Sequence, residues 1–309
     1  MKQILNPMKR LLIVGCGDIA RRTLPHLRGH YRLFGLLRNP VRHAEWHRLG
    51  VTPVAGDLDE ARSLWRIAGL ADTVLHYAPP PNLGEDDSRT RHLLAALSRG
   101  TPPQRLIYLS TSGVYGDCDG ARCDETRPVR PQTARAARRW SAERQIRHWA
   151  LRNGVRASIL RVPGIYAAER LPLDRLARGT PALCCEDDGY TNHIHADDLA
   201  RCVVAALRHA APQRIYQVSD DSELKMGDYF DAVADAFSLP RPPRISRAEA
   251  KQCLPEALLS FMLESRRLSN CRMKRELHFR LRYPTVADTL CGLNSDKMRS
   301  TVDSAAARR

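Results

Sequence analysis

The chain contains 309 residues, 43% of them hydrophobic, which is enough for one large domain with a second lobe. No apolar run approaches the roughly 20 residues of a membrane span, and the opening segment MKQILNPMKR lacks the apolar core of a signal peptide, so we expect a cytoplasmic protein without a membrane partner. Nine scattered cysteines, an odd number without C-x-x-C spacing, favour reduced thiols and argue against a zinc site.

The formal net charge is +15, which raises the question of nucleic-acid binding. Only six of the 49 basic residues are lysine, and the arginines are spread along the whole chain instead of forming one basic arm. We therefore expect no specific nucleic-acid partner, although weak binding to polyanions at low salt is compatible with this charge.

The first predicted strand, residues 11–14, runs into Gly15-Cys16-Gly17 and then a helical pattern that contains Ala20. This G-x-G-x-x-A spacing is typical of the turn that brings a dinucleotide pyrophosphate to a helix N-terminus, where free N–H groups and the helix dipole favour an anion. An ordinary turn before a helix would also fit. We predict that Gly15, Gly17, Asp18 and Ile19 contact a cofactor.

A second strand, residues 31–37, is followed by Arg38, about twenty residues after the first glycine. An acidic residue at this point would bind the ribose of NAD, whereas a guanidinium can grip a 2′-phosphate. The position therefore favours NADP, with NAD as the other option. A solvated Arg38 without such a role is the alternative in so arginine-rich a chain.

Further strands are predicted at residues 52–55, 73–77, 105–109 and 157–162, with a long helix over 131–153. Alternating strands and helices indicate an α/β fold, a doubly wound parallel sheet of the Rossmann type. Ligands bind outside the carboxyl ends of such strands. The loops that start at Gly15, Ala78, Ser110 and Pro163 are thus expected to surround one crevice.

Beyond Tyr166 we predict shorter elements: helices at 171–178, 225–237 and 256–263, and strands at 182–185 and 214–218. Residues 190–198 are expected to open a further helix that ends near His209, with Asp197 or Asp198 in its first turn. We assign residues 8–165 and 190–220 to the dinucleotide-binding domain. A smaller C-terminal substrate lobe takes residues 166–189 and 221–290. We expect the tail, residues 291–309, to be disordered because it contains few large apolar side chains.

Several ordered motifs resemble a known family, and together they cover nearly the whole chain. They are STSGVYG at 110–116, LRVPGIY at 160–166, NHIHADDLA at 192–200, YQVSDD at 216–221 and SNCRMKRELHFRLRYP at 269–284. The chain resembles extended short-chain dehydrogenase/reductases of the NAD(P)-dependent epimerase/dehydratase type. The resemblance implies a seven-stranded Rossmann domain, a substrate lobe and, in many members, a homodimer.

The resemblance also implies roles for individual residues. Thr111 would position a substrate hydroxyl, Asp57 and Leu58 would contact adenine, and Ala78 and Pro163 would lie beside the cofactor. The substrate would be a small molecule, anionic or nucleotide-linked.

The catalytic Tyr-x-x-x-Lys of the family is missing. Arg135 stands at the tyrosine position and Arg139 at the lysine position, and no lysine occurs between Lys9 and Lys225. Arginine stays protonated and has no acceptor lone pair, so it cannot replace a phenol as a proton donor near neutral pH. Arg139 could still bond the nicotinamide ribose, and Arg135 would suit an anion.

Tyr115, Tyr166 and His193 are candidate substrate-site residues that could supply the proton, and His195 is a fourth candidate. A structural role is the alternative for each. Two hypotheses follow: an NAD(P)-dependent oxidoreductase or epimerase-like enzyme with a degenerate active site, or a non-catalytic NADP-binding sensor or scaffold.

Overall fold

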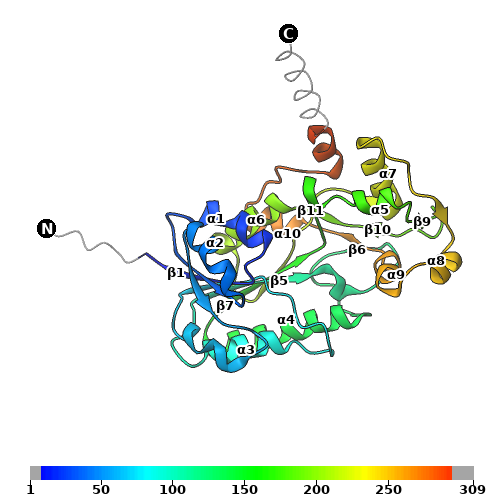
Figure 1. Cartoon of the computed structure of the whole chain (residues 1–309). Coiled ribbons are helices and arrows are strands. Elements are labelled where there is room, and N and C mark those ends of the chain that lie inside the picture. The colour runs from blue at the N-terminus through cyan, green and yellow to red at the C-terminus, as the bar shows by residue number, and fades with distance from the viewer. Residues whose placement is uncertain (1–7, 294–309) are drawn as a thin grey trace, which may run out of the picture.

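The computed structural model describes residues 8–293, and its centre is a seven-stranded parallel sheet (Figure 1). The strand order is β12-β7-β5-β4-β1-β2-β3. The strands span Arg10–Val14 (β1), Arg32–Leu37 (β2), Val51–Ala55 (β3), Thr73–His76 (β4), Arg105–Thr111 (β5), Arg156–Val162 (β7) and Arg214–Gln217 (β12). The predicted α/β doubly wound fold is confirmed. Chain order reverses between β1 and β4, which is where such sheets bind ligands.

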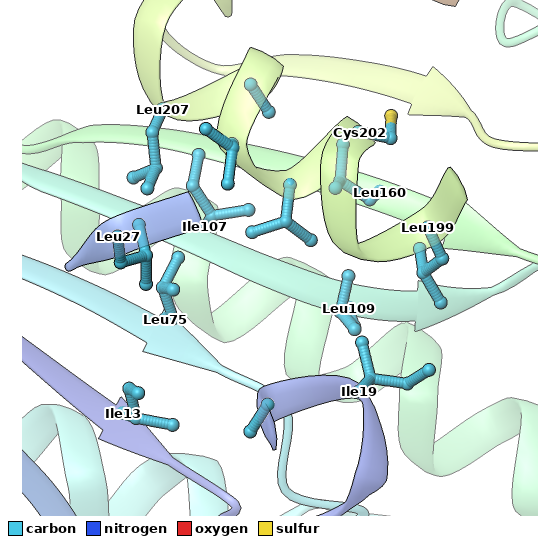
Figure 2. Packing of buried hydrophobic residues seen from close by; sticks show 14 of the residues in the cluster. Ile13, Ile19, Leu27, Leu75, Ile107, Leu109, Leu160, Leu199, Cys202 and Leu207 are labelled. Atoms are coloured by element: carbon cyan, nitrogen blue, oxygen red, sulfur yellow. The ribbon is translucent and has the colours of Figure 1, made fainter. Parts of the chain in front are cut away.

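Helices cover both faces of the sheet (Figure 1). One face carries α1 (Asp18–Leu27), α2 (His43–Arg48) and α6 (Ala196–His209), and the other carries α3 (Ser88–Leu97) and α4 (Ala134–Asn153). Figure 2 shows Leu199, Cys202 and Leu207 of α6 packed over Ile107 and Leu109 of β5. Because both faces are covered, strands such as β1, β2 and β5 are largely apolar.

Helix α4 begins three residues later than predicted. The side chain of Thr133 accepts a hydrogen bond from the backbone N–H of Ala136 and so caps the first turn. Gly154 ends the helix in the left-handed region, at φ 67°. These two caps fix the segment that carries Arg135 and Arg139.

Short elements build the lobe around a core that contains Tyr166, Leu176, Phe230 and Val233. Strands β8 (Gly164–Tyr166), β10 (Tyr190–Thr191) and β11 (His193–His195) lie largely in residues assigned above to the dinucleotide-binding domain. The strands of the lobe are β9 (Ala182–Leu183), β13 (Leu224–Lys225) and β14 (Arg244–Ile245). Its helices are α5 (Leu173–Ala177), α7 (Met226–Ala236), α8 (Arg247–Cys253) and α9 (Glu256–Met262). Further elements are β6 (Arg122–Cys123), β15 (Arg267–Leu268), α10 (Cys271–Glu276), the helical residues 286–293 and the 3-10 helices Pro40–Arg42, Ala61–Ile67, Ser112–Tyr115 and Ala168–Arg170.

Three expectations for the C-terminal half need correction. The strand predicted at 182–185 stops at Leu183, and α8 and α10 were not predicted. Met273, Leu277 and Phe279, assigned to the lobe, pack in the core under α1 and α6. Residues 291–293 are helical, and Leu293 packs against the lobe core. The rest of the predicted tail, 294–309, lies outside the described residues.

Over residues 8–293, no helix combines the length and apolarity needed to cross a membrane.

Candidate functional site

Three adjoining hollows follow the carboxyl edge of the sheet from β2 to the lobe. The β2-side hollow, about 500 Å³, is lined by Arg38, Asp57, Leu58 and Ala78 among others. It shares Gly15, Gly17 and Tyr77 with a central hollow of about 280 Å³. The central hollow shares Thr111, Arg139, Pro163 and Ile165 with a lobe cavity of about 500 Å³. The shared linings make one groove, which we call the edge groove.

The glycine loop forms the floor of the edge groove between its first two hollows. Gly15 has φ +96°, and a Cβ there would lie 2.4 Å from the backbone N of Ala78, so no other residue fits. Gly17 caps α1 without a side chain, and a Cβ there would meet nothing within 4 Å. The first turn of α1 therefore opens into the groove, as the sequence predicted.

Asp18 places a carboxylate at this helix N-terminus, in the lining of the central hollow. Arg22 and Arg170 each hold an Asp18 oxygen at 3.1 Å. Ile19 lines the same hollow and is 8% exposed. Arg22 also pairs with Glu169 and Asp197, so the two arginines offset only part of the negative charge at this helix end.

Arg38 lies at the open end of the β2-side hollow, with 69% of its side chain exposed. Its guanidinium is 3.9 Å from both Asp57 and Asp59. Asp59 is held more closely by Arg89, at 2.6 Å, and that hydrogen bond lowers the pKa of Asp59. Asp57 remains near Arg38 at 3.9 Å, and the exposed Arg38 guanidinium lies at the end of β2.

Thr111, Arg135 and Arg139 all line the lobe cavity, so the structure brings the three predicted catalytic positions together. Arg139 donates to the carbonyl of Leu109 at 2.9 Å and to the Tyr108 hydroxyl at 3.1 Å. The pKa of Arg135 is lowered, first by partial burial and then by Arg139 and other nearby arginines, although Glu264 opposes the shift. The first turns of α4 thus present two guanidinium groups to the lobe cavity.

A buried ion pair lies behind the end of the lobe cavity that Thr111 and Arg139 line. Glu143, one helical turn after Arg139, accepts two hydrogen bonds from Arg161 of β7, at 3.1 and 2.7 Å. The same carboxylate accepts a 2.6 Å hydrogen bond from Ser110, next to Thr111. Both charged side chains are at most 2% exposed. The ion pair therefore ties α4 to the ends of β5 and β7.

His193 and Tyr166 form part of the lobe wall of the cavity. Burial lowers the pKa of His193 to about 4, so the ring is neutral at pH 7, and its Nδ1 has no hydrogen-bond partner among the described residues. Its ring packs against Tyr229, with centroids 4.3 Å apart. The Tyr166 hydroxyl instead lies 3.3 Å from the Thr289 hydroxyl, and burial raises its pKa.

Tyr115 is not part of the lining of the three hollows, which corrects the prediction that it faces the substrate. Its ring is 1% exposed, lies under the Arg161 guanidinium at 4.7 Å, and its hydroxyl accepts a hydrogen bond from Gln217. His195 accepts a hydrogen bond from the Asp197 backbone and stacks on Tyr283. Both residues have the structural roles weighed as alternatives.

The sequence did not single out the residues that the lobe adds to the cavity. They include Arg175, Tyr190, Tyr229, Phe230, Glu264 and Arg266. They come from separate short elements and share no local motif. Only the folded chain brings them together.

Known proteins resemble this chain in sequence and in fold. The model of the NAD dependent epimerase/dehydratase family matches residues 11–219. A dTDP-glucose 4,6-dehydratase from Mycobacterium tuberculosis (strain CDC 1551 / Oshkosh) is 28% identical over 192 residues, which cover 55% of this chain and 57% of that protein. The match thus spans little more than half the length of this curated relative.

Solved structures extend the likeness to most of the chain. A functionally unknown conserved protein from Silicibacter pomeroyi DSS has a TM-score of 0.77 and 29% identity, over 94% of this chain and 99% of that one. A UDP-glucuronic acid 4-epimerase from Bacillus cereus in complex with NAD has a TM-score of 0.70 over 91% and 96% of the chains, and at 16% identity it is similar in fold. With the family match covering most of its parallel sheet and glycine loop, the chain belongs to the NAD dependent epimerase/dehydratase family.

Proposed function

We propose that this protein is an NAD(P)-dependent oxidoreductase of the extended short-chain dehydrogenase type, with an active site that lacks the Tyr-x-x-x-Lys pair. The edge groove carries the proposal, because it joins the β2 end, the α1 N-terminus and the lobe cavity without a break in its lining. The dehydratase relative is named for dTDP-glucose, so a nucleotide-linked or otherwise anionic small molecule is the proposed substrate.

The lining fits a dinucleotide along its length. Gly15, Gly17 and Ile19 would hold the pyrophosphate at the start of α1. Asp57, Leu58 and Ala78 would hold the adenosine end, and Arg38 would bind a 2′-phosphate. Arg139 and Pro163 would lie beside the nicotinamide, which when bound supplies or accepts a hydride.

Within the lobe cavity, Thr111 would hold the reacting oxygen and Arg135 an anionic group of the substrate. We assign proton exchange to His193, which shares this lining with Tyr166, Tyr190 and Tyr229. The neutral imidazole can accept a proton from a hydroxyl, and a bound anion would stabilise the imidazolium that forms.

A non-catalytic NADP-binding protein is the second candidate function. Its supporting observation is Arg139, which donates to the carbonyl of Leu109 and to Tyr108 and so is committed to the end of β5. Such a protein would bind the cofactor without consuming it.

Calorimetric titration with NADPH and NADH tests the binding part of the proposal. We expect one site per chain in the wild type, and a large loss of affinity in Gly17→Leu, because the new side chain projects into open groove without a clash at its Cβ. Gly292→Leu, whose Cβ also meets nothing within 4 Å but which lies outside the groove, is the matched control. Absence of binding in the wild type, or full binding in Gly17→Leu, would contradict the proposal.

A further inference from the structure

The lobe end of the cavity contains a cation for which the described residues provide no counter-ion. Arg175 of α5 is half-buried, and burial alone lowers its pKa. Its Nη2 donates to the Pro181 carbonyl at 2.7 Å, and its guanidinium lies 4.5 Å from the centre of the Phe230 ring. Its Nε–H is buried without a partner. Within the described part of the chain, Arg175 makes no ion pair with a carboxylate.

Positive side chains outnumber negative ones in the lining of the lobe cavity. The lining contains four arginines, Arg135, Arg139, Arg175 and Arg266, against one carboxylate, Glu264. Glu264 is already held by Arg266 at 2.7 Å, with both side chains about 90% buried. A half-buried guanidinium that lacks a compensating anion costs stability. The fold tolerates this cost at Arg175, in a wall that includes Phe230, Leu258 and Met262.

We propose that Arg175 binds an oxyanion of the substrate at the lobe end of the cavity, while the reacting carbon lies at the Thr111 end. This inference rests on the proposed function and adds a specificity residue to it. The ligand class is an organic acid, either a carboxylate or a phosphate ester, with a body that packs on Tyr229 and Phe230. A guanidinium recognises both oxyanions through charge-assisted hydrogen bonds.

Thermal unfolding distinguishes this role from a structural one. Without ligand, Arg175→Met should unfold at or above the wild-type midpoint, because the substitution removes an uncompensated charge and keeps an apolar stem. Arg178→Met, at the exposed end of the same helix, is the matched control. A clear drop in the midpoint of Arg175→Met, beyond that of Arg178→Met, would show that the hydrogen bond to Pro181 is structural and would overturn the proposal.

Binding of three sugars of graded charge completes the test: glucose 1-phosphate, glucuronate and glucose, at constant ionic strength. The wild type should bind at least one charged sugar about tenfold or more tightly than glucose, and Arg175→Met should lose that preference while Arg178→Met keeps it. The better of the two charged sugars identifies the oxyanion. Wild-type protein that binds neither charged sugar in preference to glucose, or an unchanged preference in Arg175→Met, would contradict the proposal. The same samples are titrated with NADPH, because Arg175 lies outside the central and β2-side hollows and should not affect cofactor binding. NADPH binding without a sugar preference contradicts only the role of Arg175, whereas absence of NADPH binding contradicts the proposed function.

Discussion

Two arginine side chains of α4, Arg135 and Arg139, line the lobe cavity. Neither guanidinium can exchange a proton near neutral pH, and we propose that the two residues stand where the family has a phenol and an ammonium. The sequence alone identified both residues, because the helix and the motif before it fix the spacing. It could not show that Arg139 donates to the carbonyl of Leu109, since that contact depends on how α4 packs on β5.

We predict that the double variant Arg135→Tyr, Arg139→Lys gains carbonyl reduction with NADPH relative to wild type, because a phenol beside an ammonium restores a general acid. General acid catalysis contributes about 10² to 10⁴ in rate, so even partial restoration is measurable as NADPH oxidation. Arg144→Tyr with Arg147→Lys, further along the same helix, controls for the changed composition. Equal rates in the wild type and the double variant would contradict the prediction.

Arg38 should determine the choice between the two nicotinamide cofactors. We predict tighter binding of NADPH than of NADH, and an affinity ratio lowered at least about tenfold in Arg38→Asp, since a charge-assisted hydrogen bond to the 2′-phosphate is lost. Calorimetry measures both affinities. Arg48 is an exposed residue of α2, and Arg48→Asp alters the charge by the same amount, so this control should leave the affinity ratio unchanged. Equal affinities for the two cofactors in the wild type would be inconsistent with this role.

Asp220 should make the stability of the protein depend on pH. Burial raises the pKa of Asp220 to about 7, above its ordinary value near 4. Between these values the folded state binds more protons than the unfolded state, so the contribution of Asp220 falls as pH rises and levels off above about pH 7. His193, with its pKa lowered to about 4, acts in the opposite direction below about pH 6.5.

Comparison with Asp220→Asn isolates the carboxyl from the effect of the histidine. The free energy of unfolding of the wild type minus that of Asp220→Asn should fall between pH 5 and 7, by at most about 1.4 kcal/mol per pH unit. Urea unfolding at each pH measures the difference. The same comparison for the exposed Asp228→Asn serves as the control. A difference that rises with pH would refute the assigned shift.

At the scale of elements, the buried ion pair between α4 and β7 positions the reactive end of the cavity. Glu143 binds Arg161 and Ser110, and all three side chains are buried. We predict that Glu143→Gln lowers the free energy of unfolding by about 3–5 kcal/mol, because it leaves Arg161 buried without its counter-ion. Glu276→Gln, which breaks the partly exposed ion pair with Arg214, should cost less than about 1 kcal/mol. Equal losses in urea unfolding would contradict this assignment.

The long elements were predictable and the short ones were not, for a physical reason. Strands such as β1 and β5 are continuous apolar runs with a turn at each end, and α4 has twenty residues between two caps, so local sequence specifies them. Helix α10 and the two-residue strands of the lobe depend on tertiary contacts. Tyr115 was misplaced for the same reason, because only its packing under Arg161 and against Gln217 decides its direction.

At the scale of the whole molecule, the edge groove is lined partly by loops at the ends of the sheet strands and partly by short elements of the lobe. The glycine loop, Arg38 and Thr111 lie at strand ends, so their convergence followed from a parallel sheet. The lobe half of the cavity, with Arg175 and Arg266, could not be predicted because its residues meet only through the fold. The half of the groove at the strand ends was therefore accessible from sequence, whereas on the lobe side only Tyr166 and His193 had been singled out.

The consumption of NADPH by the wild-type protein, measured with matched neutral and acidic carbonyl compounds, tests the proposed oxidoreductase most directly. The proposal predicts slow but measurable oxidation that is faster with the acidic compounds and sharply lower in Thr111→Ala, because Thr111 orients the reacting oxygen. NADPH that binds in the edge groove but is never consumed with any compound, in the wild type as in Thr111→Ala, would contradict an enzymatic role and leave the non-catalytic binding protein.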